Sequence, residues 1–373
     1  MKNSDRIVED VMLSFRSVCR LGLVWLSVTA MFGTATFNCA AGGGSDDQRG
    51  VRVVPNLAQN RVDVLIDGRL FTAYVFPTTL KKPVLFPLNT AQGTPVTRGF
   101  PLEPRPGERV DHAHHAGLWF NYGDVNGVDF WNNANTLKPE QQAKMGAILH
   151  REVKRTANGK DQGELEVVME WIMPGDKVIL REETKFIFHA GQNLRGVDRI
   201  TKLTALGERV VFKDNKEGTI GMRVARQLEH PSNEPLVFTD ANGKATSVAK
   251  LDNTGVTGLY RSSEGKTGDD VWGTRGRWVT LSGKIGQEAV TVAMFDHPGN
   301  PGYPTYWHAR GYGLFAANPL GQKALSNGKD ELNFTLEAGK SATFRHRILI
   351  ISGETRPDGI EDYYRKFVAD ARP

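Results

Sequence analysis

Cysteine is nearly missing from this sequence, and its two cysteines lie close to one end. Cys19 and Cys39 both fall within the first 41 of the 373 residues. The rest of the chain therefore has no ligands for a cysteine zinc site or an iron–sulfur cluster, no thiolate nucleophile and no disulfide bond. Its stability must come from a hydrophobic core, and the chain is long enough to build one large domain.

Long apolar runs are missing beyond residue 41. Before that point, residues 21–37 form an apolar segment that follows two arginines and precedes two alanines. This order is typical of an export signal, so we predict a signal peptide over residues 1–41 and a small-residue linker over residues 42–50. The protein would then be periplasmic or secreted, with no membrane span in the mature chain. An uncleaved N-terminal membrane anchor and a lipoprotein signal at Cys39 are the alternatives.

Charge of one sign is not concentrated in any part of the chain. The formal net charge is +5, and lysines and arginines are interleaved with acidic residues. A nucleic-acid-binding protein is expected to carry a basic block or stripe, so we predict no nucleic-acid partner. The expected partner is a small molecule.

Helical periodicity is almost absent, and an alternation of apolar and polar residues takes its place. This alternation surrounds the turn sequences Asp67-Gly68 and Pro174-Gly175, which predicts two hairpins. One helix is predicted near the C-terminus, and we expect it to cover a sheet from outside. The apolar residues that share a face of this helix are Ile360, Tyr363, Tyr364, Phe367 and Val368.

These patterns together predict an all-β fold. Many short strands with little helix are typical of sandwiches of antiparallel sheets. No linker rich in proline or serine divides residues 51–373, so we expect a single domain there. We predict a large supersandwich of the galactose-mutarotase kind with a short C-terminal helix. The longest irregular stretches, residues 138–146 and 254–276, are either loops over a site or surface excursions.

Three histidines lie close together in DHAHHAGLWFNYGDVNGVDFW, residues 111–131. In an extended backbone, His112 and His114 would project to one side and His115 to the other. Two imidazoles on one side are a common start of a metal site, although a third ligand is needed. A histidine in a turn also has an ordinary structural role, which is to bond a backbone carbonyl.

The same stretch contains aromatic and polar residues that suit a sugar. Trp119 offers a flat face on which the apolar side of a sugar ring can stack, and Asn126 and Asp129 offer hydrogen bonds to its hydroxyl groups. The structural alternatives are a plain core for the tryptophan and a tight turn at Asn126-Gly127, which Asp124 would cap.

A second polar stretch, FDHPGNPGYPTYWHARGYGLFAANPLG, covers residues 295–321. Its prolines and glycines exclude a plain strand interior and predict a rigid loop followed by a short strand. A third stretch, residues 212–230, contains Glu217 and Arg223. Arg223 could hold a carboxylate or a sugar hydroxyl, or it could simply pair with Glu217 at the surface.

The three stretches together resemble an exported bacterial family called PmoA-like, after a subunit of the particulate methane monooxygenase. The sequences that carry the resemblance are DHAHHAGLWFNYGDVNGVDFW, KEGTIGMRVA and DHPGNPGYPTYWHARGYGLFAANPLG. The resemblance implies an exported all-β protein, and the family label implies a copper-dependent oxygenase. The namesake subunit has several spanning helices, whereas this chain has no apolar run of that length after residue 41. We therefore expect the family's fold without the oxidation of methane.

We predict an exported carbohydrate-active enzyme that performs acid–base chemistry of the mutarotase, lyase or hydrolase kind. One imidazole would donate a proton and one carboxylate would accept one, since the ordinary pKa of imidazole lies near neutral pH. The predicted catalytic residues are His114 or His308 as the acid and Glu217 or Asp296 as the base. The predicted substrate-binding residues are His115, Trp119, Asn126, Asp129, Arg223, Tyr306, Arg310 and Asn318.

Three alternatives stay open, and no cofactor is certain. A divalent metal could assist the same chemistry, with His112, His114 and either His297 or His308 as its ligands. A non-catalytic carbohydrate-binding protein would keep the aromatic rings and the arginines without an acid–base pair. A copper-dependent oxygenase would need a tight copper site among the histidines.

Overall fold

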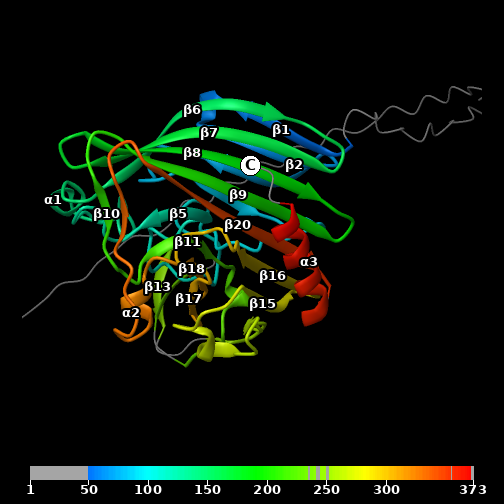
Figure 1. Cartoon of the computed structure of the whole chain (residues 1–373). Helices are drawn as coiled ribbons and strands as arrows, with labels where there is room; N and C mark the ends of the chain where they lie inside the picture. Colours follow the sequence, from blue (N-terminus) through cyan, green and yellow to red (C-terminus); the bar gives the residue numbers. More distant parts are fainter. Residues whose placement is uncertain (1–48, 234–235, 241–243, 249–251, 354, 371–373) are drawn as a thin grey trace, which may run out of the picture. The chain divides into compact units, whose positions relative to one another are not determined.

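The computed structural model describes residues 49–373 except for 234–235, 241–243, 249–251, 354 and 371–373 (Figure 1). The predicted signal peptide, its two alternatives and most of the predicted linker lie outside the described residues. All described residues belong to one unit, Ser45–Pro373. None of the described helices is long and apolar enough to cross a membrane.

Two eight-stranded antiparallel sheets make up most of the fold. Sheet I contains, in spatial order, β1 (Val51–Asn56), β2 (Arg61–Ile66), β3 (Arg69–Val75), β4 (Val84–Leu88), β5 (Leu118–Tyr122), β11 (Gly218–Arg223), β18 (Leu314–Asn318) and β17 (Tyr306–Arg310). Sheet II contains, in spatial order, β14 (Leu259–Ser262), β15 (Trp278–Ile285), β16 (Glu288–Asp296), β20 (Ser341–Ser352), β9 (Leu194–Ala205), β8 (Lys177–Ala190), β7 (Gln162–Met173) and β6 (Ala147–Ala157). Figure 1 shows β6 to β9 side by side in this order.

Both predicted hairpins are confirmed. Asp67 and Gly68 join β2 to β3 and have positive φ angles of 50° and 75°, which a tight hairpin turn requires. β7 and β8 pair along their whole length, with Pro174-Gly175 in the turn between them.

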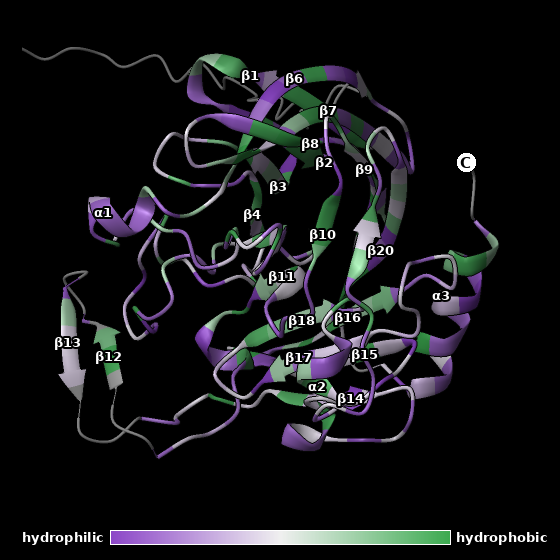
Figure 2. Cartoon of the chain, turned by 60° about the vertical axis from the view of Figure 1, so that its left-hand side comes forward, coloured by the Kyte–Doolittle hydropathy of each residue, from purple (hydrophilic) through white to green (hydrophobic). Residues whose placement is uncertain are grey.

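The core lies between the two sheets. Along β5 the side chains of Leu118 and Phe120 point into it, and along β8 those of Phe186 and Phe188 do the same. The residues between them in the sequence point to the outer faces, because successive side chains of a strand alternate. Figure 2 shows this alternation of hydrophobic and hydrophilic residues along the strands. The predicted all-β sandwich is therefore confirmed.

Smaller elements surround the sheets. Two ribbons pair β10 (Val210–Phe212) with β19 (Phe334–Leu336) and β12 (Leu236–Thr239) with β13 (Ala245–Val248). The other short elements are α1 (Pro139–Gln142), α2 (Gln322–Leu325) and the 3-10 turns η2 (Leu57–Gln59), η3 (Arg226–Leu228) and η4 (Gly268–Val271).

Helix α3 (Pro357–Ala369) covers the outer face of sheet II, which confirms the predicted C-terminal helix. Its buried residues Ile360, Tyr364 and Phe367 pack against a cluster that includes Phe295 of β16. The rings of Phe367 and Phe295 lie 6.2 Å apart between centroids. Burial of this apolar face, rather than the helix alone, holds α3 in place.

Phe367→Ala should lower the free energy of unfolding by about 3 kcal/mol, because the change removes a buried ring and leaves a cavity under α3. Urea unfolding followed by circular dichroism measures the loss. Arg365→Ala is the control on the same helix, where the side chain is 70% exposed and the expected change is below about 0.5 kcal/mol. Equal losses in the two variants would contradict the packing of α3.

Candidate functional site

The outer face of sheet I carries many of the predicted site residues. In β17, Trp307 and Ala309 belong to the core between the sheets. Tyr306, His308 and Arg310 alternate with them and therefore point outward. Trp119, in β5, and Arg223, in β11, share this outer face by the same rule.

One row of residues crosses this face through four neighbouring strands. Trp119 lies opposite Gly221. Gly221 lies opposite Ala316, which in turn lies opposite His308. A Cβ atom on Gly221 would come within 2.7 Å of Trp119 and 3.1 Å of Trp131, so both indole rings lie directly over this glycine. The small residues in the middle of the row leave room for the large side chains at its ends.

Residues 111–115 form a turn and not an extended segment. His112 has a φ of 44°, and its carbonyl oxygen accepts a hydrogen bond from the His115 amide at 2.9 Å. The ring of His112 stacks on that of His115 at 4.9 Å, and His114 packs edge-on against His115 at 4.3 Å. The prediction that His115 points away from the other two is wrong, because the backbone reverses at His112 and gathers all three imidazoles.

Asp111 anchors this turn to sheet I. Its Oδ1 atom accepts hydrogen bonds from Arg98 and Arg223, both at 2.7 Å. Its Oδ2 atom bonds Nδ1 of His112 at 2.9 Å. Burial opposes the ionisation of Asp111, but the bond from His112 and the charges of Arg223 and Arg98 outweigh it. The pKa of this carboxyl is therefore held well below its usual range.

Arg98 and a second cation, Lys82, also bond the backbone of the turn. Arg98 donates to three backbone carbonyls of the turn in addition to the Asp111 side chain. Lys82 donates to the carbonyl oxygen of His114 at 2.7 Å, and its Nζ atom lies 5.4 Å from the centre of the Trp119 ring. Burial lowers the pKa of Lys82 to about 7. The loop that carries the histidines is thus fixed by buried positive charge.

The buried imidazoles of the turn are neutral. Burial lowers the pKa of His114 to about 2, and the charge of Lys82 adds to this effect. Burial also lowers the pKa of His115 well below its usual range. Nδ1 of His115 faces the Arg223 guanidinium at 3.3 Å. A guanidinium can only donate, so this nitrogen accepts and the ring proton sits on Nε2.

The Nε atoms of Arg98 and Arg223 have no hydrogen-bond partner among the described residues, and neither do four buried ring nitrogens beside the turn. The ring nitrogens are Nε2 of His114 and His115 and the indole nitrogens of Trp119 and Trp131. The two indole rings lie 5.3 Å apart, and His115 stacks on Trp119 at 5.1 Å. An unpaired buried polar group costs about 1–3 kcal/mol, so these nitrogens suit contact with water or a polar ligand.

His308 and Glu217 form a second group on the same face. Nδ1 of His308 lies 3.0 Å from the carbonyl oxygen of Lys216 and 3.8 Å from Oε2 of Glu217. A carbonyl only accepts, so Nδ1 carries the proton and Nε2 has the lone pair. Burial and the charges of Lys216 and Arg310 lower the pKa of His308 to about 3. Burial raises the pKa of Glu217, against the opposing charge of Lys216.

His112 lies within electrostatic reach of both groups. A proton on His112 lowers the pKa of His114, of His308 and of Glu217. The ring of His112 also stacks on that of Tyr312 at 5.4 Å, in the turn that directly follows β17. The structure thus brings the imidazoles near residue 114 and the one at residue 308 to the same face of the protein.

A groove of about 420 Å³ opens beside these groups. The side chains that line it include Arg109, His230, Asp269, Trp272, Arg310 and Tyr312. Tyr312 stands between the groove and the turn, since its ring stacks on His112 at 5.4 Å and lies 4.8 Å from the Arg223 guanidinium. Two of the lining side chains come from residues 254–276. The expectation that this whole stretch is irregular is wrong, because Leu259–Ser262 form strand β14 of sheet II.

Asp296 lies on the other side of sheet I, between the two sheets. It alternates with the outward residues of β16, and its carboxyl accepts hydrogen bonds from Asn300 at 2.7 Å and from the Thr305 amide at 2.8 Å. It also lies 3.6 Å from Nε2 of His346, and burial raises its pKa to about 7. The grouping of Asp296 with His308 is therefore wrong, because Asp296 faces the core.

His297 is also separated from the histidine turn. Its ring packs edge-on against Phe367 of α3 at 5.4 Å, and its Nδ1 accepts a hydrogen bond from the Gly299 amide at 3.0 Å. It cannot join His112 and His114 as a metal ligand, so that predicted ligand set is wrong. Within the ranges that the structure describes, no three side chains of His, Asp or Glu are arranged to hold one metal ion. These residues do not fit a divalent metal or a copper site.

The remaining predicted residues hold loops in place. Asn126 has a φ of 52°, and its side chain bonds the backbone on either side of residue 210. Asp124 caps the turn at Asn126-Gly127, which is the structural alternative given for this segment. Asn318 bonds the backbone that carries Glu217. Tyr306 donates to an acidic side chain near α2 at 2.6 Å, and Asp129 accepts bonds from two backbone amides that follow it.

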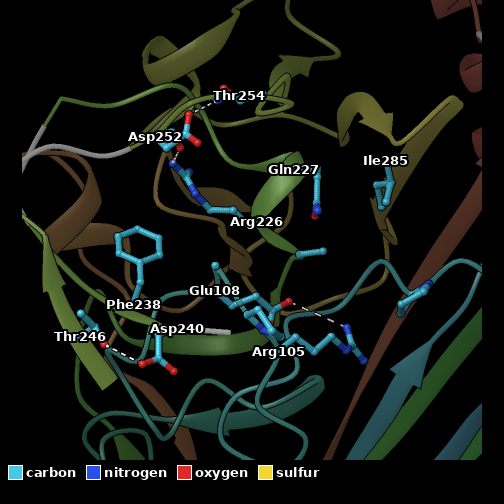
Figure 3. Close-up of a pocket in the computed structure, with 14 residues that line it drawn as sticks. Arg105, Glu108, Arg226, Gln227, Phe238, Asp240, Thr246, Asp252, Thr254 and Ile285 are labelled. Carbon is cyan, nitrogen blue, oxygen red and sulfur yellow. Dashed lines mark hydrogen bonds and ion pairs between the residues drawn. The ribbon is translucent and has the colours of Figure 1, made fainter. Parts of the chain in front are cut away.

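A second cavity, of about 620 Å³, lies beside the β12–β13 ribbon and contains none of the predicted site residues (Figure 3). Some of its charged side chains pair with one another, as Arg105 does with Glu108 at 3.8 Å. Glu229 separates this cavity from the groove. Its Oε2 atom accepts bonds from Arg226, which lines the cavity, at 2.7 Å and from Arg109, which lines the groove, at 2.6 Å.

The fold and the site define a two-sheet, all-β protein with a histidine-rich, positively charged outer face. The chain belongs to a family described as a family of unknown function (DUF6807), whose model matches residues 61–365. That range includes every candidate site residue. No curated protein matches the sequence.

Some solved structures have a loosely similar fold. The GH36 alpha-galactosidase AgaB from Geobacillus stearothermophilus is 11% identical and overlaps with 85% of this chain and 43% of its own, at a TM-score of 0.40. The Slr1438 protein from Synechocystis sp. PCC 6803 is 10% identical, with 82% and 97% covered and a TM-score of 0.32. A galactose mutarotase related enzyme from Lactobacillus acidophilus is 11% identical, with 82% and 98% covered and a TM-score of 0.28. The chain spans less than half the length of the alpha-galactosidases, and likenesses this loose assign no activity.

Several residues of the site were not among those predicted from the sequence. Asp111 immediately precedes the histidines, and Tyr312 lies in the second polar stretch, so the sequence could have pointed to both. Lys82 and Arg98 stand in loops far from the three polar stretches. No local pattern marks them, and only the tertiary fold brings them to the turn.

Asp111→Asn should destabilise the protein by about 3 kcal/mol at pH 7, because it leaves two buried guanidinium groups without their carboxylate. The depressed pKa of Asp111 contributes stability that is present above its unfolded-state pKa of about 4. That stability is lost as the pH falls through the folded-state value, so the difference between variant and wild type should shrink in acid. Urea unfolding at pH 7 and pH 3 measures it.

The control for this variant is Asp362→Asn on α3, where the carboxyl pairs only with an exposed arginine and the side chain is 64% exposed. It should change stability by less than about 0.5 kcal/mol at both pH values. A wild-type unfolding curve for Asp111→Asn at pH 7 would refute the anchoring role of this carboxylate.

Proposed function

We propose that the groove and the adjoining outer face of sheet I form the active site of a carbohydrate-active enzyme that uses general acid–base catalysis. One observation carries the proposal. A neutral imidazole, His308, and a carboxyl of raised pKa, Glu217, lie 3.8 Å apart beside a groove with aromatic walls. Titratable groups with such shifted pKa values in a concave site are typical of acid–base enzymes.

The two groups suit opposite roles. Burial disfavours the charged form of each, which keeps His308 unprotonated and favours the protonated form of Glu217. Nε2 of His308, which has the lone pair, would accept a proton from the sugar, and Glu217 would donate one. This reverses the assignment made from the sequence, where an imidazole was the acid and Glu217 a base. His114 is unsuited to the acid role, because a pKa of about 2 leaves it no proton to give near neutral pH.

The groove supplies the groups that a sugar requires. Trp272 presents an aromatic ring, on which the apolar face of a sugar stacks beside the Arg310 guanidinium. The ring of Tyr312 is already in contact with His112 and Arg223. The indole nitrogen of Trp272 and Nε2 of His230 are buried and have no partner among the described residues, so they can bond hydroxyl groups. His308 and Arg310 are two residues apart on β17, which places their backbones about 7 Å from each other on one face. The proposed reaction therefore requires a substrate that extends from the groove past Arg310 to His308, which does not itself line the groove.

His308→Asn and Glu217→Gln should each lower kcat by about 100-fold or more, because each removes one partner of the proton transfer. Substrate affinity should change little. The measurement is turnover of a panel of glycosides and oligosaccharides, followed by NMR, with dissociation constants from calorimetry on the same preparations.

His189→Asn and Glu183→Gln on sheet II are the matched controls, since they make the same chemical changes outside the site. Both should keep wild-type turnover. If the wild-type protein binds sugars without converting any of them, and the site variants lose only affinity, the protein is a carbohydrate-binding module and not an enzyme. Absence of both binding and turnover across the panel would refute the proposal as a whole.

The ionisation of Glu217 should also determine how kcat/KM depends on pH. The acid must be protonated, so kcat/KM should fall as the pH rises through the raised pKa of Glu217. His308, with a pKa of about 3, stays neutral over the same range and contributes no limb above pH 4. In Glu217→Gln the residual rate should be flat there. A falling limb that persists in this variant would assign the acid to another group.

A further inference from the structure

We infer that the sugar bound in the groove carries an anionic group, a carboxylate or a sulfate, and that Arg310 binds this group. The inference rests on the proposed function and specifies its substrate class. It starts from one side chain of the groove whose donors are all available. Arg310 is exposed on β17, and its guanidinium makes no hydrogen bond and no ion pair within the described part of the chain.

Two aromatic rings hold this guanidinium in the groove. Its central carbon lies 5.5 Å from the centre of the Trp272 ring and 5.8 Å from that of Tyr312. A guanidinium that rests on aromatic faces keeps the N–H groups at its edge, where they form a planar fork. That fork matches two oxygens of a carboxylate or a sulfate. The charge is thus fixed in position before a ligand arrives, which reduces the entropy lost on binding.

The other charged groups that line the groove do not pair with Arg310. Arg109 shares the carboxylate of Glu229 with Arg226, at 2.6 and 2.7 Å, so this guanidinium already has an anionic partner, whereas that of Arg310 has none among the described residues. Asp269 is the one acidic side chain among the described lining residues; it is 83% exposed, and its carboxylate lies 3.2 Å from Nδ1 of His230. It therefore sits at the solvent rim, paired with an imidazole and not with Arg310.

The surroundings of the groove are positively charged. Arg98 and Arg223 share the single carboxylate of Asp111, so one positive charge remains there. Positive neighbours lower the pKa of each buried imidazole on this face: Arg310 acts on His308, and Arg98 and Arg223 act on His114. A site with excess positive charge favours an anionic ligand over its neutral counterpart.

The hydroxyl groups of the same ring have partners close by. The indole N–H of Trp272 can donate to one of them. Nε2 of His230 is buried and has no partner among the described residues, so it can bond another of them. An acidic sugar would therefore find a stacking ring, two hydrogen-bonding nitrogens and a cation in one groove.

The test compares three forms of the same di- or trisaccharide: the neutral sugar, the uronic acid and the 6-O-sulfated sugar. Calorimetry at 50 and 300 mM NaCl measures their affinities for the wild-type protein, Arg310→Gln, Arg310→Lys and the control Arg155→Gln, an exposed arginine on sheet II. The wild type should bind at least one anionic form about tenfold more tightly than the neutral form, and salt should reduce the difference.

Arg310→Gln should abolish this preference, Arg310→Lys should retain part of it, and Arg155→Gln should not alter it. Which of the two anionic forms binds more tightly identifies the substituent. Equal affinity for neutral and anionic forms would overturn the inference and leave the proposed function intact. A preference that survives in Arg310→Gln, with an unchanged urea midpoint, would overturn the role of Arg310. Failure of all three forms to bind or react in any preparation would remove both the inference and the proposed function.

Discussion

The Asp111 carboxylate is the group on which the geometry of the site depends. It joins three segments that are far apart in the sequence, since it bonds Arg98 of a loop, Arg223 of β11 and the neighbouring ring of His112. Two buried cations against one anion would normally be a costly arrangement. Arg98 offsets that cost by donating to backbone carbonyls of the turn as well. The turn that gathers the three imidazoles is thus held by the bonds of the terminal nitrogens of these guanidinium groups, while their Nε atoms have no partner among the described residues.

Sheet I gives this arrangement a rigid base. The inward side chains of its strands belong to the core between the sheets. Several outward side chains, Trp119 among them, form a second buried cluster that supports the histidine turn. Gly221 and Ala316 are small because Trp119 and Trp131 lie over the middle of the row. Much of the groove wall comes instead from loops, which supply Trp272 and Tyr312, the latter from the turn between β17 and β18. The residues that stabilise the core and those proposed to react with a ligand therefore lie on opposite faces of the same strands.

The architecture could be predicted from the sequence because it depends on local patterns. Alternation of side chains predicts strands, Asp67-Gly68 predicts its hairpin and the face of Phe367 predicts α3, and none of these requires knowledge of distant residues. The site was readable only in part. Residue type drew attention to His308 and Glu217, yet their pairing depends on the register of β17, β18 and β11.

What the sequence could not decide was the direction of a side chain. Asp296 and His308 stand in one motif, but they end up on opposite sides of sheet I. His115 was assigned the wrong side because the extended backbone assumed for residues 111–115 does not exist once His112 takes a positive φ. Lys82 gave no signal at all, because an isolated lysine becomes informative only when the fold buries it.

The acid–base pair and the proposed anion site are electrostatically coupled. In the free protein, burial and the charges of Lys216 and Arg310 hold the pKa of His308 low, which makes its ring a weak base. An anionic group bound to Arg310 would compensate one of these charges and raise the pKa of His308. The imidazole would thus become a stronger base only when a substrate of the correct charge occupies the groove. A neutral sugar in the same groove would leave His308 as it is, so the arginine that selects the substrate would also adjust the group that reacts with it.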